Sequence, residues 1–176
     1  MLQTISILLE NKPGALLRVT GVLSARGYNI ETLTVAKTID PELSRMTISV
    51  EVEDRLRGQV VKQMNKLINV LQATDLTDAP AVIREMVLLR VRCTQESRTA
   101  VLKEAEIFNA RVVDSSVEGF AIEATGDTNK MDEFIDIMGS YGEIDVARSG
   151  VIAMSLESKK LRLQPPVPMA VPVPAI

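Results

Sequence analysis

The chain has 176 residues, 46% hydrophobic and 24% charged, enough for one domain or two small ones with a buried core. Its net charge of −3 and lack of a basic tract argue against a nucleic-acid partner. With no histidine and one cysteine, it lacks the usual general base, the commonest transition-metal ligand and any intrachain disulfide. No apolar run reaches the roughly 18 residues of a membrane span, and the lone cysteine fits a reducing compartment, so we expect a cytoplasmic protein without membrane contacts.

The chain begins with a predicted strand, turn and helix. Residues 3–9 are β-branched and apolar with partial alternation, which predicts a strand, and residues 11–14 form a turn. The following helix is predicted to end at Gly27. Its apolar face comprises Ala15, Leu16, Val19, Val22 and Leu23. Residues 28–38 are rich in strand-forming residues and predict a second strand.

Three further elements complete the first half. Residues 45–53 alternate cleanly and predict a strand in a sheet with one face in water. Its core side comprises Met46, Ile48, Val50 and Val52, and its water side Thr47, Ser49, Glu51 and Glu53. A helical stripe follows, formed by Leu56, Val60, Met64 and Leu67. Residues 69–76 predict a closing strand, so the order is β-α-β-β-α-β.

The second half repeats this order with little sequence similarity to the first. A strand face is formed by Val87, Leu89, Val91 and Cys93, and a helix face by Val101, Leu102, Ala105 and Phe108. Residues 110–114 and 119–125 predict a strand pair around a tight turn. The last helix stripe comprises Met131, Phe134, Ile135 and Met138, before a closing strand at 143–149. Each half is therefore predicted to be the split β-α-β arrangement of ferredoxin-like folds.

The predicted fold class is α+β, with two tandem ferredoxin-like βαββαβ domains at residues 1–77 and 81–163. Residues 78–80 form the boundary between them. Five of the last thirteen residues, 164–176, are proline. Because proline cannot complete a helix or a central strand, we expect an extended or disordered tail, or a proline-rich ligand for a partner domain.

A search for catalytic chemistry finds no motif. Asp132 and Asp136 lie four residues apart on the last helix, opposite its apolar stripe, as a solvated face would place them. Cys93 has no histidine to activate it and is interpreted as a buried structural residue. Neither GxGxxG nor GxxxxGK[ST] occurs. We therefore expect no catalytic residue and no metal site.

The segment from Glu10 to Leu16 joins the end of a strand to the start of a helix. Helix N-termini carry unpaired N–H groups and a partial positive charge, and Gly14 lets a ligand approach the backbone closely. A carboxylate fits such a place, and the amide of Asn11 matches an ammonium or a carboxylate. An ordinary strand-to-helix turn has the same composition, so both interpretations stay open.

These residues resemble a known family. The stretch LLENKPGALLRVTGVLSARGYNIETLTV at 8–35 is similar to the ACT domain that opens the regulatory, or small, subunit of acetohydroxyacid synthase, also called acetolactate synthase. DPELSRMTISV at 40–50 and DVARSG at 145–150 are also typical of that family. The resemblance runs from about residue 1 to 163, and the proline-rich tail is not part of the family pattern.

The resemblance implies a non-catalytic subunit that binds and activates the catalytic large subunit. It implies feedback inhibition by branched-chain amino acids, chiefly valine, bound where two ACT domains pair edge to edge in a homodimer. The matching effector residues are Asn11, Gly14, Ala15 and Leu16 of one chain, with Asn29 and Ile30 of its partner. Thr94–Ser97 replaces the Pro-Gly turn in the second half, where no effector site is expected. Thiamine diphosphate, flavin and magnesium would belong to the large subunit, leaving this chain without a cofactor.

Two other functions are less consistent with the sequence. An ACT-type sensor could regulate a different enzyme or a transcription factor, but the latter needs a helix-turn-helix and a basic face. A small stand-alone enzyme would have to work without histidine. The strand at 28–38 has Lys37 but no proline to protect its edge, which favours a homodimer.

Overall fold

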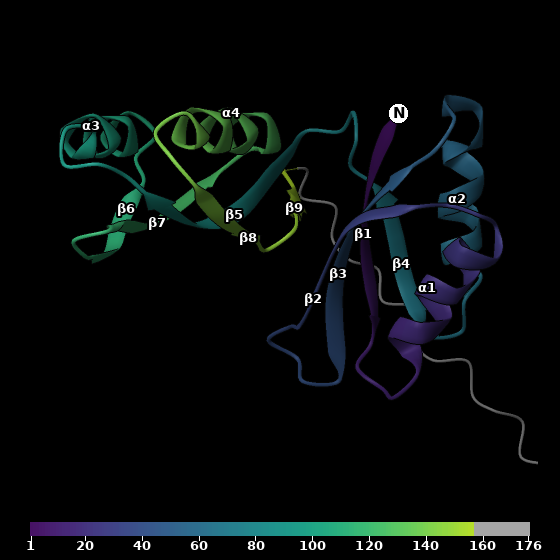
Figure 1. Cartoon of the computed structure of the whole chain (residues 1–176). Coiled ribbons are helices and arrows are strands. Elements are labelled where there is room, and N and C mark those ends of the chain that lie inside the picture. Colours follow the sequence, from purple (N-terminus) through teal and green to yellow (C-terminus); the bar gives the residue numbers. More distant parts are fainter. Residues whose placement is uncertain (157–176) are drawn as a thin grey trace, which may run out of the picture.

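The structure, a computed structural model, describes residues 1–156. Two α/β units follow each other along the chain, and the predicted boundary at 78–80 lies between the last strand of the first unit and the first strand of the second (Figure 1). The predicted tail at 164–176 and the last residues of the predicted second domain lie outside the described residues. No helix within the described part is long and apolar enough to cross a membrane.

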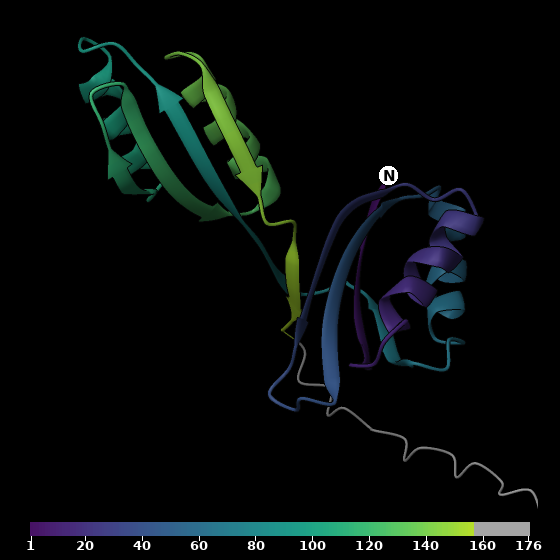
Figure 2. The same ribbon diagram turned by 60° about the horizontal axis from the view of Figure 1, so that its bottom comes forward.

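The first unit is a four-stranded antiparallel sheet with its helices on one face (Figures 1 and 2). The elements are β1 (Leu2–Glu10), α1 (Ala15–Ala25), β2 (Ile30–Lys37), β3 (Leu43–Glu51), the 3-10 turn η1 (Asp54–Leu56), α2 (Arg57–Met64) and β4 (Val70–Asp75). The strand order is β2-β3-β1-β4, which places β2 and β4 at the edges. This is the predicted split β-α-β topology.

Alternating apolar residues build the core of this unit. One face of β1 and β3 packs on the inner faces of α1 and α2, and the buried residues include Ile5, Ile7, Leu9, Val19, Leu23, Met46, Ile48, Val50, Val60 and Met64. Burying each large side chain contributes about 1.5–3 kcal/mol to stability. Gly27, with φ +74°, donates its N–H to the carbonyl of Ser24 and ends α1 where the sequence predicts.

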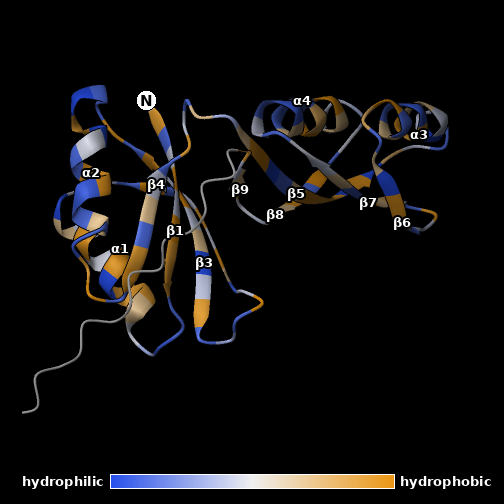
Figure 3. Cartoon of the chain, turned by 180° about the vertical axis from the view of Figure 1, so that it is seen from behind, coloured by the Kyte–Doolittle hydropathy of each residue, from blue (hydrophilic) through white to orange (hydrophobic). Residues whose placement is uncertain are grey.

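The second unit has the same topology. Its elements are β5 (Ala81–Arg92), α3 (Arg98–Ile107), β6 (Arg111–Ser115), β7 (Gly119–Gly126), α4 (Thr128–Gly139) and β8 (Ile144–Arg148), with strand order β6-β7-β5-β8. Its core comprises Val87, Leu89, Val91, Val101, Ala105, Phe108, Phe120, Ile122, Ala124, Met131, Phe134 and Met138. In Figure 3 the helices of both units carry hydrophobic and hydrophilic stretches, as amphipathic helices over a sheet do.

One strand was not predicted. β9 (Ile152–Ser155) pairs antiparallel with the first residues of β5, from Ala81 opposite Ser155 to Arg84 opposite Ile152. Figure 2 shows this ribbon between the two larger sheets. Beside it, Leu76, Val151 and Ala153 form a small buried cluster that joins the two units.

Three sequence interpretations of exposure need correction. The predicted water face of β3 is partly buried: Thr47 is 2% exposed and Ser49 0%. The N–H of Ala153 donates to Thr47 Oγ1 at 3.3 Å, so this polar row serves an internal contact. Leu16 and Leu102, predicted to face the cores, are 41% and 42% exposed, since each lies one position past a buried residue and points away from the sheet.

Candidate functional site

The turn between β1 and α1 has an unusual backbone. Gly14 is the N-cap residue of α1 with φ +82° and ψ −9°, a left-handed conformation that favours glycine. No side chain caps this helix, so N–H groups of its first turn stay available to a ligand. A Cβ built at Gly14 would meet no atom within 4 Å. The turn therefore presents open space directly above a helix N-terminus.

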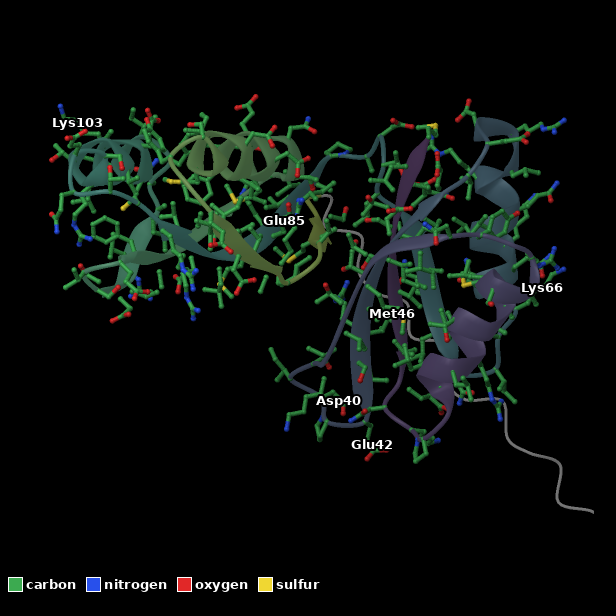
Figure 4. The ribbon with its side chains drawn as sticks, in the orientation of Figure 1. Asp40, Glu42, Met46, Lys66, Glu85 and Lys103 are labelled. Atoms are coloured by element: carbon green, nitrogen blue, oxygen red, sulfur yellow. The ribbon has the colours of Figure 1, made fainter. Side chains whose placement is uncertain are left out.

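Asn11 is fixed by the loop between β2 and β3. Its backbone N–H donates to the carbonyl of Glu42 at 2.7 Å, and its Nδ2 donates to the carbonyl of Pro41 at 2.9 Å. Figure 4 shows Glu42 and Asp40 in this loop at the lower end of the first sheet. With Nδ2 engaged, Asn11 Oδ1 forms no hydrogen bond within residues 1–156 and can accept one from an ammonium group.

The charges beside the turn are paired with each other. Lys12 Nζ lies 3.0 Å from Glu10 Oε1, and Asn69 Nδ2 donates to Glu10 Oε2 at 2.7 Å. These hydrogen bonds from Lys12 and Asn69 lower the pKa of Glu10. The remaining attraction for an anion comes from the helix N-terminus itself.

Ala15 and Leu16 complete the turn in different ways. Ala15 is buried, and its N–H donates to the carbonyl of Lys12 at 3.1 Å. Its side chain therefore packs in the core, and its N–H already has a partner. Leu16 and Leu17 expose apolar side chains beside the open backbone, Leu17 at 73%. A small aliphatic group bound here would contact carbon atoms while its polar groups reached the helix N-terminus.

The two remaining predicted residues lie at the other end of the sheet. The carbonyl of Asn29 accepts from the N–H of Glu51, which is paired with Leu2 at the start of β1. Asn29 Nδ2 donates to Glu31 Oε1, and Ile30 begins β2. At about 3.3 Å per residue, β1 separates the two groups by roughly 25 Å. One chain thus brings Asn11, Gly14, Ala15 and Leu16 together, but not with Asn29 and Ile30.

Two side chains that the sequence singles out lie in the second unit, away from this turn. Asp132 pairs with Arg148 at 2.6 Å, and Cys93 is half-buried against the second core. Arg148 also pairs with Glu85, whose side chain is 1% exposed. Sequence reasoning missed this buried pair, because Glu85 falls among alternating residues as any surface glutamate would. Within residues 1–156, no three metal-ligating side chains gather in one place.

Comparisons with known proteins agree over both units. Residues 5–72 match the family described as the AHAS small subunit-like ACT domain, and residues 84–157 match the small subunit of acetolactate synthase. The chain is similar to the probable acetolactate synthase small subunit of Archaeoglobus fulgidus, 47% identical over 91% of this chain and 100% of that protein. It is 39% identical to the acetolactate synthase isozyme 3 small subunit of Escherichia coli, over 92% of this chain and 100% of that one.

The fold comparison gives the same result. The crystal structure of the acetolactate synthase small subunit from Thermotoga maritima superposes with a TM-score of 0.78 at 35% identity, covering 88% of this chain and 97% of that one. Sequence and fold agree over both units, including the ACT domain that carries the open turn. The chain belongs to the family of acetolactate synthase small subunits.

Proposed function

We propose that this subunit binds and activates the catalytic large subunit of acetolactate synthase and makes it sensitive to a branched-chain amino acid, chiefly valine. The observation that carries the effector part of the proposal is the open space above the N-terminus of α1, where Gly14 has a left-handed backbone and no side chain caps the helix. Thiamine diphosphate, flavin and magnesium bind the large subunit in this proposal, and this chain supplies regulation alone.

The chemistry of the turn matches a small aliphatic amino acid. The carboxylate would accept from N–H groups in the first turn of α1, where the helix dipole favours an anion. The ammonium would donate to Asn11 Oδ1, and the branched side chain would pack on Leu16. Valine carries all three groups.

The proposal includes a homodimer through β2. This strand pairs with β3 on one side, and its other edge pairs with no strand among residues 1–156. If two copies of β2 pair antiparallel, the start of one lies beside the end of the other. The partner's Asn29 and Ile30 then come to the end of the sheet that carries Asn11 and Gly14, which reunites the six predicted residues in one site.

Reconstitution with the large subunit tests the regulatory role. Adding this chain to the purified large subunit should raise the turnover of pyruvate and make it valine-sensitive. The chain alone, with all cofactors supplied, should have no activity. A large subunit that neither binds this chain nor responds to valine in its presence would contradict the proposal.

Mixed dimers test whether the effector site is shared between chains. Gly14→Asp and Asn29→Ala should each impair both sites of a homodimer. A dimer with one chain of each kind has one doubly altered site and one intact site, so a statistical mixture recovers about a quarter of the high-affinity valine sites. If the mixture recovers none, both residues belong to a site within one chain.

A further inference from the structure

Residues 148–153, here called the joint, run from the second sheet onto the first. The joint begins at Arg148, the end of β8, and includes the first residues of β9. Two hydrogen bonds join it to the first sheet: Thr34 Oγ1 donates to the carbonyl of Ser149 at 3.2 Å, and Thr47 Oγ1 accepts from the N–H of Ala153 at 3.3 Å. Both threonines lie on the face away from α1 and α2, on β2 and β3.

Gly150 allows the close approach of the joint to β2. Its φ is +78°, and a Cβ built there would lie 3.0 Å from Thr34 Oγ1 and 3.5 Å from Thr32 Cβ. A larger residue would have to push the joint away from the strand while also adopting a conformation that favours glycine. The backbone of the joint therefore rests directly on the side chains of β2.

The other side of the joint is fixed to the second unit. Ser149 Oγ accepts from the N–H of Met86 at 3.0 Å. Arg148 pairs with Asp132 of α4 and with the buried carboxylate of Glu85 on β5. Figure 4 shows Glu85 where the second unit approaches β9. The joint is thus attached to the second sheet, to α4 and to two strands of the first sheet.

We propose that the joint couples the effector state of the first unit to the second unit. The proposal rests on the proposed function, because Asn29 precedes β2, Ile30 begins it and Thr34 lies further along the same strand. Effector binding between two copies of β2 favours one position of this strand. A shift of β2 moves the joint through the contacts of Thr34 and Gly150. The joint in turn moves the second unit through the contacts of Arg148 and Ser149. Without these contacts, valine would bind but its effect on the catalytic partner would weaken.

The test removes the two hydroxyl contacts and keeps the strand shape. The double variant Thr34→Val with Thr47→Val loses both contacts, and valine suits a strand as well as threonine does. Thr32→Val is the matched control, since it lies on the same strand beside the joint and its buried Oγ1 has no hydrogen-bond partner among the described residues. Each variant is assayed for valine affinity by calorimetry on the small subunit, for activation of the large subunit, and for valine inhibition of the complex.

We expect the double variant to bind valine within about twofold of the wild type and to activate normally. Its valine-dependent inhibition should fall about fivefold or more, the lower end of ordinary allosteric coupling. Thr32→Val should match the wild type in all three assays. Gly150→Ala, which displaces the same joint by a different route, should repeat the loss.

Several results would overturn the inference. Full inhibition of the complex with the double variant shows that the joint carries no signal, and loss of valine affinity in that variant assigns the threonines to binding. Equal loss in Thr32→Val shows that any change on this face has the effect. A wild-type subunit that binds no valine is a different result, because it refutes the proposed effector site itself.

Discussion

The two units of this subunit have the same topology but different turns at the start of their first helix. No side chain caps either helix, but the turn before α1 ends in Gly14, whose left-handed backbone leaves open space above the helix. In the second unit, the turn before α3 satisfies its own polar groups: Ser97 N–H lies 3.4 Å from Thr94 Oγ1, and Ser97 Oγ donates to the carbonyl of Thr94 at 3.2 Å.

Arg98 closes the second turn further. Its guanidinium donates to the carbonyl of Ser116 at 2.8 Å and lies 4.2 Å from the ring centroid of Phe120. This side chain ties the start of α3 to the loop after β6, whereas nothing lies within 4 Å of the Cβ position of Gly14. The start of α3 is therefore covered by a side chain of its own unit, whereas the start of α1 is open. This difference supports the placement of the proposed effector site in the first unit.

The largest expected effect comes from filling the open turn. Gly14→Asp places a carboxylate where the carboxylate of valine should bind, so valine affinity should fall on the order of a hundredfold, or about 3 kcal/mol. The positive φ of Gly14 costs an L-residue about 1–2 kcal/mol, partly offset by an acid at a helix N-terminus, so stability should fall by about 1 kcal/mol. Valine inhibition of the reconstituted synthase and thermal unfolding measure the two effects.

Ser97→Asp is the matched control, because it places the same acid at the N-cap of α3 with φ −84°. This variant should keep its stability and its full valine response. If Gly14→Asp is still inhibited at the wild-type valine concentration, the effector binds elsewhere.

Asn29→Ala should weaken valine binding about tenfold, or about 1.4 kcal/mol, by removing one polar contact from the partner chain without introducing repulsion. The corresponding position before β6 in the second unit is already an alanine, Ala110. Arg111→Ala, next to it, should leave calorimetric valine binding unchanged. An Asn29→Ala subunit with wild-type affinity would remove this residue from the site.

A change in the turn before α3 should alter the stability of the protein and leave valine binding unchanged. Thr94→Ala removes the hydroxyl that accepts from the N–H of Ser97 before α3 and should lower the free energy of unfolding by about 1 kcal/mol, as the loss of one hydrogen bond does. Urea unfolding gives this value, and valine titration of the same sample should match the wild type. A change in valine affinity would mean that the second turn also serves the effector.

The smallest effect concerns Glu10, at the end of β1. Because its folded pKa is lowered by Lys12 and Asn69, its contribution to stability is present above its ordinary pKa of 4.5 and is lost as the pH falls through the lowered folded value. Glu10→Gln should therefore lower the unfolding temperature slightly at pH 7 and hardly at pH 3. Glu106→Gln on the exposed side of α3 should change neither; an equal effect at both pH values would show that charge is not the cause.

The strands and helices were predictable because their apolar residues recur at the spacing of each element. β1 and β3 alternate around Ile7 and Met46, which are both fully buried, and Gly27 ends α1 as a glycine with positive φ. The open turn was also visible, because Asn, Pro and Gly together mark a break between strand and helix. Its assignment to an effector came from the family resemblance, and that assignment remains a prediction.

The contacts between the units were not predictable in the same way. β9 is four residues long, and its partner on β5 lies about seventy residues earlier in the chain. No local sequence pattern therefore predicts this pairing. Thr47 and Ser49 look like solvent residues because they are polar, yet both are buried, and Thr47 accepts a hydrogen bond from the backbone of the joint. Polar residues that meet a backbone of another unit have the same pattern as residues that meet water.

A valine titration followed by the backbone amide resonances of the dimer compares both turns in one sample and tests whether the effector binds at the turn before α1. We expect the largest shifts at Gly14, Ala15, Leu16 and Asn29, with residues 94–98 unchanged. Because Gly14 of one chain and Asn29 of its partner belong to the same proposed site, their resonances should saturate at the same valine concentration. Shifts centred on residues 94–98, or equal shifts at the two turns, would contradict an effector site at the turn before α1.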